Sequence, residues 1–405
     1  MSLDRRPTLL LPPTSSKPSP QPPSLSTSSP MTSSYPTPFT ALFLFHPVPL
    51  CPRLSSISSR KSTSDPSATA AAEVLPTFHA YARSGAATGQ VVYANYGRVE
   101  DFAALRSRGV EVAGNVVLAR YGKIYRGDIV RNAHLAGAVA AIVYTDAKDY
   151  GGHVRPWFPD GLWLPPSGVQ VGSTYRGLGD LTTPGWASIE GCERVDAEEA
   201  VASELTPAIP SLPVSSRDAE EILKTIGGQV APADWQGADG APLYHLGPGP
   251  GFVDLIYLGN ETIMKIQNVV AVIEGKDEPD RYVILGNHRD AWTFGAVDPN
   301  SGTASLLEVA QRFHKLQKRG WRPRRSIVLC NWDAEEYSLL GSTEWVEDNR
   351  AILASRAVAY INVDSAVSGP VSMPLQPHNL MRCLKKYPRR FKILIIHPSH
   401  CFNLG

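Results

Sequence analysis

The chain has 405 residues, 39 basic and 38 acidic side chains and a formal net charge of +1. A nearly neutral chain has no electrostatic basis for binding nucleic acid, so we expect no nucleic-acid partner. Its five cysteines form no CxxC pair, which argues against a zinc ribbon or a disulfide scaffold. The length is sufficient for two domains with substantial hydrophobic cores.

Residues 1–75 differ in composition from the rest of the chain. Residues 1–70 hold 14 of the 35 prolines and 17 serines but no glutamate. Such a segment cannot bury enough apolar surface to order itself, so we expect residues 1–75 to be disordered. The Ser-rich, acid-poor composition also fits a transit peptide for an organelle such as the plastid. The apolar run at residues 39–45 is too short to span a bilayer, so no transmembrane segment is predicted.

From residue 76 the pattern is that of a globular α/β domain that ends near residue 263. Residues 147–187 are rich in glycine, proline and aromatic side chains, which predicts a long ordered loop region. Loops of this length in a compact domain usually have a function, such as binding a ligand. A glycine-bracketed turn at residues 121–127 carries Lys123 and Arg126, which taken alone are ordinary solvated charges. Strands are predicted at residues 89–96, 115–120 and 140–144, and helices at residues 128–137 and 216–227.

Further along, three apolar runs each end in histidine or acidic residues. They are Tyr282–Asp290, Ser326–Asp333 and Ala357–Asp364, and a helical pattern occupies residues 301–318. Continuous apolar strands separated by a helix predict a mostly parallel sheet, whose sites lie beyond the carboxyl ends of the strands. We therefore expect five side chains to meet at one edge of this sheet: His288, Asp298, Glu335, Glu336 and Asp364.

The chemistry of these residues favours a metal site. Imidazole and carboxylates are the ligands of zinc or manganese, and several carboxylates around one point are unfavourable without a cation. Asp290 lies on the same side of an extended segment as His288 and can hold the second imidazole nitrogen. Adjacent Glu335 and Glu336 cannot point the same way, so one can bind metal while the other acts as a general base. Turn, cap and surface roles are the ordinary alternatives for each residue alone.

The same residues carry a resemblance to a known family. Tyr282–Asp298, Trp332–Trp345 and Tyr360–Asp364 resemble glutamate carboxypeptidase II and its plant relatives, which are M28 metallopeptidases, and residues 120–127 resemble the protease-associated domain of that family. The resemblance implies an α/β fold, with a mostly parallel zinc-peptidase sheet flanked by helices and an inserted protease-associated domain. The implied divisions are residues 76–263 for the protease-associated domain, 264–369 for a partial peptidase domain, and 370–405 for an unmatched tail.

The resemblance also implies an activity. It is the hydrolysis, by a zinc-dependent exopeptidase, of the peptide bond before a C-terminal acidic residue of a small peptide. Of two zinc ions, one would be held by His288 and Asp364 and the other by Glu336, with Asp298 bridging them. Glu335 matches the general base, and Arg126 matches the arginine that binds the C-terminal carboxylate of the substrate.

Other family features are implied less directly. Four residues match the ligands of a structural calcium ion: Thr183, Trp186, Glu344 and Glu347. Ser173 stands where animal members have an asparagine that contacts the substrate carboxylate. Relatives are type II membrane-anchored homodimers, which leads us to expect an endomembrane or plasma-membrane location, and their dimerising domain is not found in this chain.

We expect the chain to be truncated at both ends relative to this family. Relatives complete the second zinc site with a histidine beyond the end of this chain, so the chain as written is expected to be inactive. On assumed codons, residues 370–405 also fit a frame-shifted continuation of the family sequence. The alternative to an enzyme is a non-catalytic relative of the transferrin receptor type, which the retained ligand residues disfavour.

Overall fold

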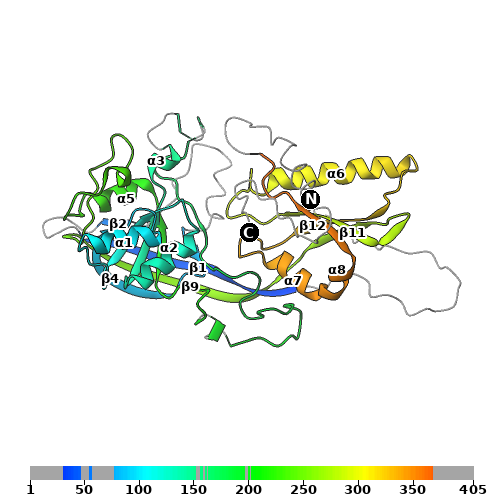
Figure 1. Cartoon of the computed structure of the whole chain (residues 1–405), viewed down its shortest axis with the longest axis horizontal. Helices are drawn as coiled ribbons and strands as arrows, with labels where there is room; N and C mark the ends of the chain where they lie inside the picture. The colour runs from blue at the N-terminus through cyan, green and yellow to red at the C-terminus, as the bar shows by residue number, and fades with distance from the viewer. Residues whose placement is uncertain are drawn as a thin grey trace.

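The computed structural model describes residues 31–46, 54–56, 77–151, 156–157, 160–161, 163–196, 199–200 and 202–367. Two separate clusters of buried apolar side chains form its cores, one between residues 78 and 257 and the other between residues 266 and 353. Figure 1 shows the two regions side by side along the long axis, with β1 and β9 running beneath the N-terminal region and reaching the C-terminal region near α7. We call them the N-terminal region (residues 77–257) and the C-terminal region (residues 266–367).

The N-terminal region is built around a parallel sheet. The order β9-β4-β5-β6-β8 places four parallel strands beside the antiparallel β9. Every residue of β5 and β6 is buried, as expected of parallel strands with both faces covered. The strands are β4 (Gly85–Tyr93), β5 (Val116–Arg120), β6 (Ala140–Tyr144), β8 (Ser211–Val214) and β9 (Phe252–Ile266).

Short helices complete this region, and a two-stranded parallel pair lies apart from the main sheet. The strands and helices predicted at residues 89–96, 115–120, 128–137, 140–144 and 216–227 are all present, with small differences in their bounds. The helices are α1 (Val99–Ser107), α2 (Arg126–Leu135), α3 (Ala147–Tyr150), α5 (Ser216–Leu223) and the 3-10 helix η2 (Ala233–Trp235), and the pair is β3 (His79–Ala80) with β7 (Gly172–Ser173).

Part of the segment expected to be disordered is a strand. Residues Met31–His46 form β1, which runs antiparallel to β9 along its whole length, and Leu54–Ser56 form β2 at the outer edge. The expectation of disorder is therefore wrong for these residues. The physical reason is that β4 pairs with only one edge of β9, and the opposite edge presents unpaired backbone groups that β1 satisfies. The rest of residues 1–75 lies outside the described part of the chain.

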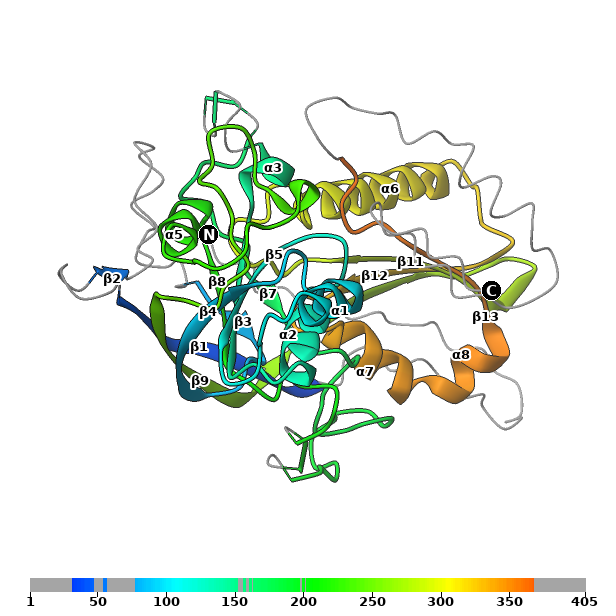
Figure 2. The ribbon, with the colours of Figure 1, turned by 60° about the vertical axis from the view of Figure 1, so that its left-hand side comes forward.

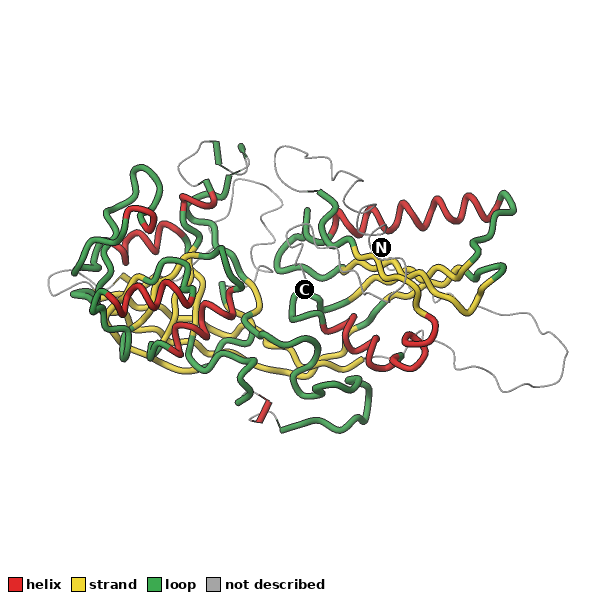
Figure 3. Tube along the Cα trace, in the orientation of Figure 1, coloured by secondary structure: helices red, strands yellow, loops and turns green. Residues whose placement is uncertain are grey.

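The C-terminal region has a four-stranded sheet in the order β10-β12-β11-β13. The pairs β11–β12 and β11–β13 are parallel, and only β10 runs antiparallel, which agrees with the predicted mostly parallel sheet. Figures 2 and 3 show α6 on one side of this sheet and α7 and α8 on the other. The elements are β10 (Val269–Ile273), β11 (Glu278–His288), α6 (Asn300–Lys318), β12 (Arg325–Trp332), α7 (Leu340–Asp348), α8 (Arg350–Arg356) and β13 (Ala357–Asn362).

The junction between the regions lies within one strand. The boundary expected at residues 263 and 264 falls inside β9, whose residue Ile266 packs in the second core while Val253 and Leu255 pack in the first. This strand therefore connects the two cores covalently without an intervening linker. Among the described residues, no helix is both long and apolar enough to cross a membrane.

Candidate active site and metal centre

The carboxyl ends of three parallel strands bring the predicted cluster together. The last residue of β11, His288, pairs in register with Trp332 at the end of β12, and Gly286 pairs with Asn362 at the end of β13. His288 Nε2 lies 3.0 Å from Asp364 Oδ1 and 3.1 Å from Asp298 Oδ1. The structure places these three residues together at this edge.

These three side chains fit a metal ion. One ligand atom each from His288, Asp298 and Asp364 lies within 4.8 Å of the others, and within the described residues this is the group of histidine and acidic side chains arranged in that way. The side chains of His288 and Asp364 are 1% and 6% exposed, whereas that of Asp298 is 53% exposed. The site is therefore rigidly buried on one side and open on the other, and a nitrogen–oxygen donor set suits zinc.

Glu335 and Glu336 take different directions beside this group. Glu335 Oε2 lies 3.8 Å from His288 Nε2, whereas Glu336 Oε1 accepts a hydrogen bond from the backbone N–H of Trp292 (3.3 Å). Glu336 therefore lies outside the group of His288, Asp298 and Asp364, but the charges of that group still affect its pKa. As expected for neighbouring residues, only one of the two glutamates faces the imidazole.

The charges at this edge are unbalanced. Burial raises the pKa of Glu335 to about 7, an effect that the charge of His288 partly offsets, and burial together with the charge of Glu335 raises the pKa of Glu336 to about 9. Burial lowers the pKa of His288, but hydrogen bonds with Asp290, Asp298 and Asp364 outweigh it and raise this pKa to about 12. One imidazole thus faces several carboxylates that repel one another, and a cation would relieve this repulsion.

Asp290 links the imidazole to the two glutamates. Its Oδ1 lies 3.4 Å from His288 Nδ1, which is a long contact, and accepts a hydrogen bond from the backbone N–H of Glu335 (2.9 Å). Its Oδ2 accepts from the backbone N–H of Glu336 (3.1 Å). The predicted contact with His288 is present, and Asp290 has a second function that the sequence did not indicate, since it fixes the turn carrying both glutamates.

The loop that carries the glutamates is strained and held by the N-terminal region. Ala334, Ser338 and Leu339 have positive φ angles of 51°, 75° and 59°, a conformation that costs energy for residues other than glycine. Ser338 O accepts a hydrogen bond from the backbone N–H of Gly179 (2.8 Å), and the hydroxyls of Ser173 and Ser338 lie 3.1 Å apart. Contacts between the two regions thus hold this loop in place.

The sequence analysis did not identify the residues whose hydrogen bonds hold the backbone next to His288 and Asp364. Asn287 is fully buried, and its Nδ2 donates to Val363 O (2.9 Å), next to Asp364. The Thr303 hydroxyl lies 2.5 Å from Asn287 Oδ1 and 2.9 Å from His288 O. Gly302 has no room for a side chain, because a Cβ would lie 2.1 Å from Val363 O. An asparagine within an otherwise apolar strand was the available signal.

Arg126, predicted to bind a carboxylate, begins helix α2 in the N-terminal region. Its Nη1 donates to Ser173 O (3.3 Å), and its guanidinium packs on Gly172, where an added Cβ would lie 2.4 Å from Cζ. Its Nε is buried and has no hydrogen-bond partner among the described residues. Ser173, the residue that departs from the animal family pattern, therefore contacts Arg126 through its backbone and Ser338 through its side chain.

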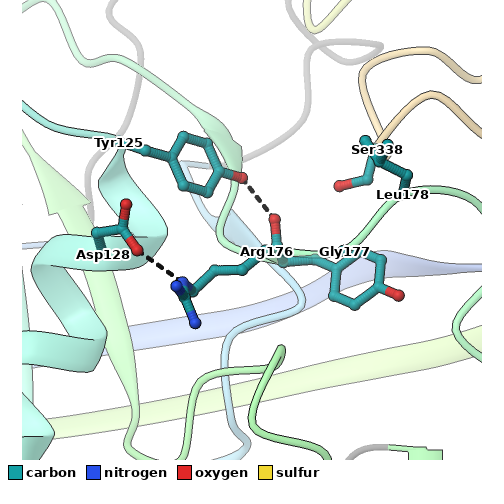
Figure 4. A pocket seen from close by; sticks show the side chains of 7 residues that line it. Tyr125, Asp128, Arg176, Gly177, Leu178 and Ser338 are labelled. Carbon is teal, nitrogen blue, oxygen red and sulfur yellow. Dashed lines mark hydrogen bonds and ion pairs between the residues drawn. The ribbon is translucent and has the colours of Figure 1, made fainter. Parts of the chain in front are cut away.

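A cavity of 330 Å³ opens where the two regions meet, close to the glutamate loop. Arg176 crosses it to pair with Asp128 (2.6 Å), and the Tyr125 hydroxyl donates to Tyr175 O (2.8 Å), with Ser338 across from them (Figure 4). The lining residues are Tyr125, Asp128, Tyr175, Arg176, Gly177, Leu178 and Ser338. Space for a peptide side chain is thus present beside the loop that carries Glu335 and Glu336.

The predicted calcium ligands lie partly together at the junction of the regions. Glu344 is fully buried, and its carboxylate accepts from the Ser188 N–H (2.7 Å) and lies 3.4 Å from the Thr183 hydroxyl. Burial raises the pKa of Glu344 to about 7. Glu347 Oε2 is buried without a hydrogen-bond partner among the described residues, which fits an oxygen-binding cation such as calcium. The Trp186 side chain donates to Glu193 O (2.8 Å), and the contribution expected from Trp186 is through its backbone oxygen.

Two family models match the chain. The model described as peptidase family M28 matches residues 268–391, and the model of the PA domain, the protease-associated domain, matches residues 87–174. The first match passes residue 370, at which the family pattern is expected to stop. That expectation is wrong for residues 370–391, which lie outside the described part of the chain.

Relatives of known sequence and structure are similar to this chain. "Probable glutamate carboxypeptidase LAMP1" of Arabidopsis thaliana is 63% identical over 74% of this chain and 42% of its own length. "Aminopeptidase NAALADL1" of Mus musculus is 43% identical over 75% of this chain and 42% of its own length. The solved "Aminopeptidase from Aneurinibacillus sp. strain AM-1" is 16% identical, with a TM-score of 0.45 over 84% of this chain and 60% of that chain. This chain spans less than half the length of these curated relatives.

Proposed function

Since this chain carries a segment of peptidase family M28 and a PA domain, we propose that it is a zinc-dependent exopeptidase that removes a C-terminal acidic residue from small peptides. The observation that supports the proposal is the meeting of His288, Asp298 and Asp364 within 4.8 Å at one sheet edge, with Glu335 beside them. Relatives named as glutamate carboxypeptidases support the direction of cleavage.

Each ligand residue has a proposed part in holding zinc. His288 and Asp364 would hold one ion and Glu336 a second, with Asp298 shared between them. When bound there, zinc supplies positive charge that polarises a peptide carbonyl and makes water a better nucleophile. Glu344, Glu347 and Thr183 would hold the calcium ion at the junction of the two domains.

Glu335 is the proposed general base. Its carboxylate takes a proton from the attacking water as the water oxygen bonds to the peptide carbon, and it returns that proton to the nitrogen when the C–N bond breaks. Burial supports this role, because it raises the pKa of Glu335 to about 7 and so makes the carboxylate a better proton acceptor than an exposed one. Asp290 orients the backbone on which Glu335 stands.

Zinc content tests the proposal directly on the chain itself. We expect the purified chain to bind zinc, as measured by calorimetric titration and mass spectrometry, and His288→Ala to abolish that binding. His314→Ala is the matched control, because His314 is exposed on α6 and away from the cluster. A chain that binds no zinc would overturn the proposal and support a non-catalytic relative.

A second candidate differs in the direction of cleavage, and a relative named as an aminopeptidase favours it. The two candidates are distinguished with dipeptides blocked at one end. An N-acetylated dipeptide with a free acidic C-terminus is hydrolysed only by the carboxypeptidase. A dipeptide with a free amino group and a C-terminal amide is hydrolysed only by the aminopeptidase. Because this chain spans less than half of its relatives, the assay is run on the chain and on a version extended with the C-terminal part of the Arabidopsis relative.

A further inference from the structure

A fully buried histidine that the proposed reaction does not use lies in the N-terminal region. His79 is 0% exposed and stands in strand β3, which pairs in parallel register with β7, so that His79 faces Gly172 along the ladder. Its Nε2 lies 2.7 Å from the Tyr121 hydroxyl, and its Nδ1 lies 2.9 Å from the Ser211 hydroxyl. Both ring nitrogens are therefore engaged.

The hydrogen-bond partners determine where the protons lie. The Tyr121 hydroxyl donates to Gln170 O (3.0 Å), a carbonyl that can only accept. The tyrosine oxygen therefore accepts from His79 Nε2–H, which leaves Nδ1 as the acceptor of the Ser211 hydroxyl proton. Each group is satisfied only when His79 is neutral and carries its proton on Nε2.

This neutral ring lies close to Arg126. Burial, together with the positive charge of Arg126, lowers the pKa of His79 to about 3, so the imidazole does not repel the guanidinium at neutral pH. Arg126 in turn rests on the segment that His79 holds, because its Nη1 donates to Ser173 O and its guanidinium packs on Gly172. From the other side, the Tyr125 hydroxyl donates to Ser173 O (2.7 Å).

We propose that His79 is a positioning residue for Arg126. Its two hydrogen bonds join the start of the loop that leads into Arg126, at Tyr121, with strand β8 at Ser211. Through Tyr121 they also hold residues 170–173, on which the guanidinium rests. The ring keeps Arg126 in one place for a carboxylate ligand without competing for that ligand, since it carries no charge. This inference rests on the proposed role of Arg126 in binding the substrate carboxylate.

Binding of a small carboxylate tests the inference without requiring hydrolysis. Isothermal titration of the full chain, with zinc present, measures the dissociation constants of L-glutamate and of its α-amide. His79→Ala is expected to weaken glutamate binding roughly tenfold and to change amide binding by less than about twofold, because lost hydrogen bonds move the guanidinium. Tyr121→Phe is expected to act in the same direction. His79→Gln, which keeps an N–H near the Nε2 position, is expected to restore most of the affinity.

Arg126→Ala, measured in parallel, separates this inference from the proposed function. If Arg126→Ala removes the preference for glutamate over the amide and His79→Ala does not, the role of His79 is overturned while the carboxylate site stands. If Arg126→Ala leaves the preference unchanged, both are overturned. Additive effects in the double variant would also overturn the role of His79, since a residue that acts through Arg126 has no effect without it. Should His79→Ala fail to fold, Ser211→Ala removes one of the same hydrogen bonds and gives the same test.

Discussion

The two regions each bury a cluster of charged side chains, but only one of these clusters is balanced. In the N-terminal region, Arg120 Nη1 lies 3.5 Å from Asp146 Oδ2, with both side chains at most 1% exposed. The same oxygen accepts from the hydroxyls of Tyr144 (2.8 Å) and Tyr244 (3.0 Å). The guanidinium also lies 4.3 Å from the centre of the Tyr96 ring. One cation therefore faces one carboxylate, and neutral groups supply the remaining hydrogen bonds, which are the tyrosine hydroxyls on Asp146 and the oxygens of Asn95 and Gln236 on Arg120.

In the C-terminal region, one imidazole faces Asp298, Asp364 and Glu335. This cluster holds more carboxylates than cations, and burial, together with the charges of neighbouring carboxylates, raises the pKa values of Glu335 and Glu336. The comparison teaches that burial of charge by itself does not mark a functional site. A balanced buried cluster stabilises a fold, whereas an unbalanced one at an open edge indicates a bound cation.

The largest effect is expected for the proposed base. Glu335→Gln keeps the shape of the side chain but removes its ability to accept a proton, so hydrolysis is expected to fall by roughly 10²–10⁴-fold. Zinc binding is expected to be unchanged. The rate is measured on the version extended with the C-terminal part of the Arabidopsis relative, and Glu308→Gln on the exposed face of α6 is the control. Full activity in Glu335→Gln would remove this residue from the chemistry.

Asp146→Asn is expected to destabilise the balanced cluster strongly. It leaves the buried guanidinium of Arg120 without its carboxylate partner, which typically costs about 3–5 kcal/mol of unfolding free energy. Urea unfolding followed by circular dichroism measures the change. Glu221→Gln, in an exposed pair with Lys224, is the control and is expected to have little effect. A similar small change for Asp146→Asn would show that the Arg120 cluster does not depend on charge balance.

Asp290→Asn is expected to weaken zinc binding by roughly 10–100-fold, the range typical of residues that orient metal ligands. The amide lacks the charge that faces His288 Nδ1 and offers only one acceptor to the two backbone N–H groups of Glu335 and Glu336. Competition with a fluorescent zinc chelator measures the affinity. Asp254→Asn, on β9 in the N-terminal region, is the control. Unchanged affinity would show that the turn holds its shape without Asp290.

The smallest effect concerns the stability of the metal-free chain. A carboxyl group whose pKa is higher in the folded state stabilises the fold while protonated, and this contribution disappears as the pH rises through the folded-state pKa. For Glu335 and Glu336 the loss extends from about pH 4.5 to about pH 7 and about pH 9, respectively. His288, with its pKa raised to about 12, loses stabilisation in the same direction above about pH 6.5.

The melting temperature in the presence of a chelator is therefore expected to fall between pH 5 and pH 9, and saturating zinc should flatten this dependence. Glu336→Gln should raise the melting temperature of the metal-free chain at pH 8, opposite in sign to Asp146→Asn. A metal-free chain whose stability rises over this pH range would contradict the assignment of excess negative charge.

The sequence by itself determined the main strands of both sheets, several of the helices and the side chains that follow the strand ends. Residues 116–119 and 140–144 are continuous apolar runs, which only a doubly covered strand buries well. His288, Asp298 and Asp364 follow such runs, and the carboxyl ends of parallel strands meet at one edge whatever the details of packing. Local patterns were sufficient here, because periodicity and strand ends are properties of short segments.

The tertiary structure alone decided the contacts between segments that are distant in sequence. The pairing of β1 with β9, the hydroxyl contact of Ser173 with Ser338 and the hydrogen bonds of Asn287 each join residues whose partners no local pattern specifies. The choice of Glu335 over Glu336 to face His288 likewise depends on Asp290 and on the positive φ angles of the loop. Such contacts depend on which surfaces the packed elements leave available to each other, and that information exists only once the chain has folded.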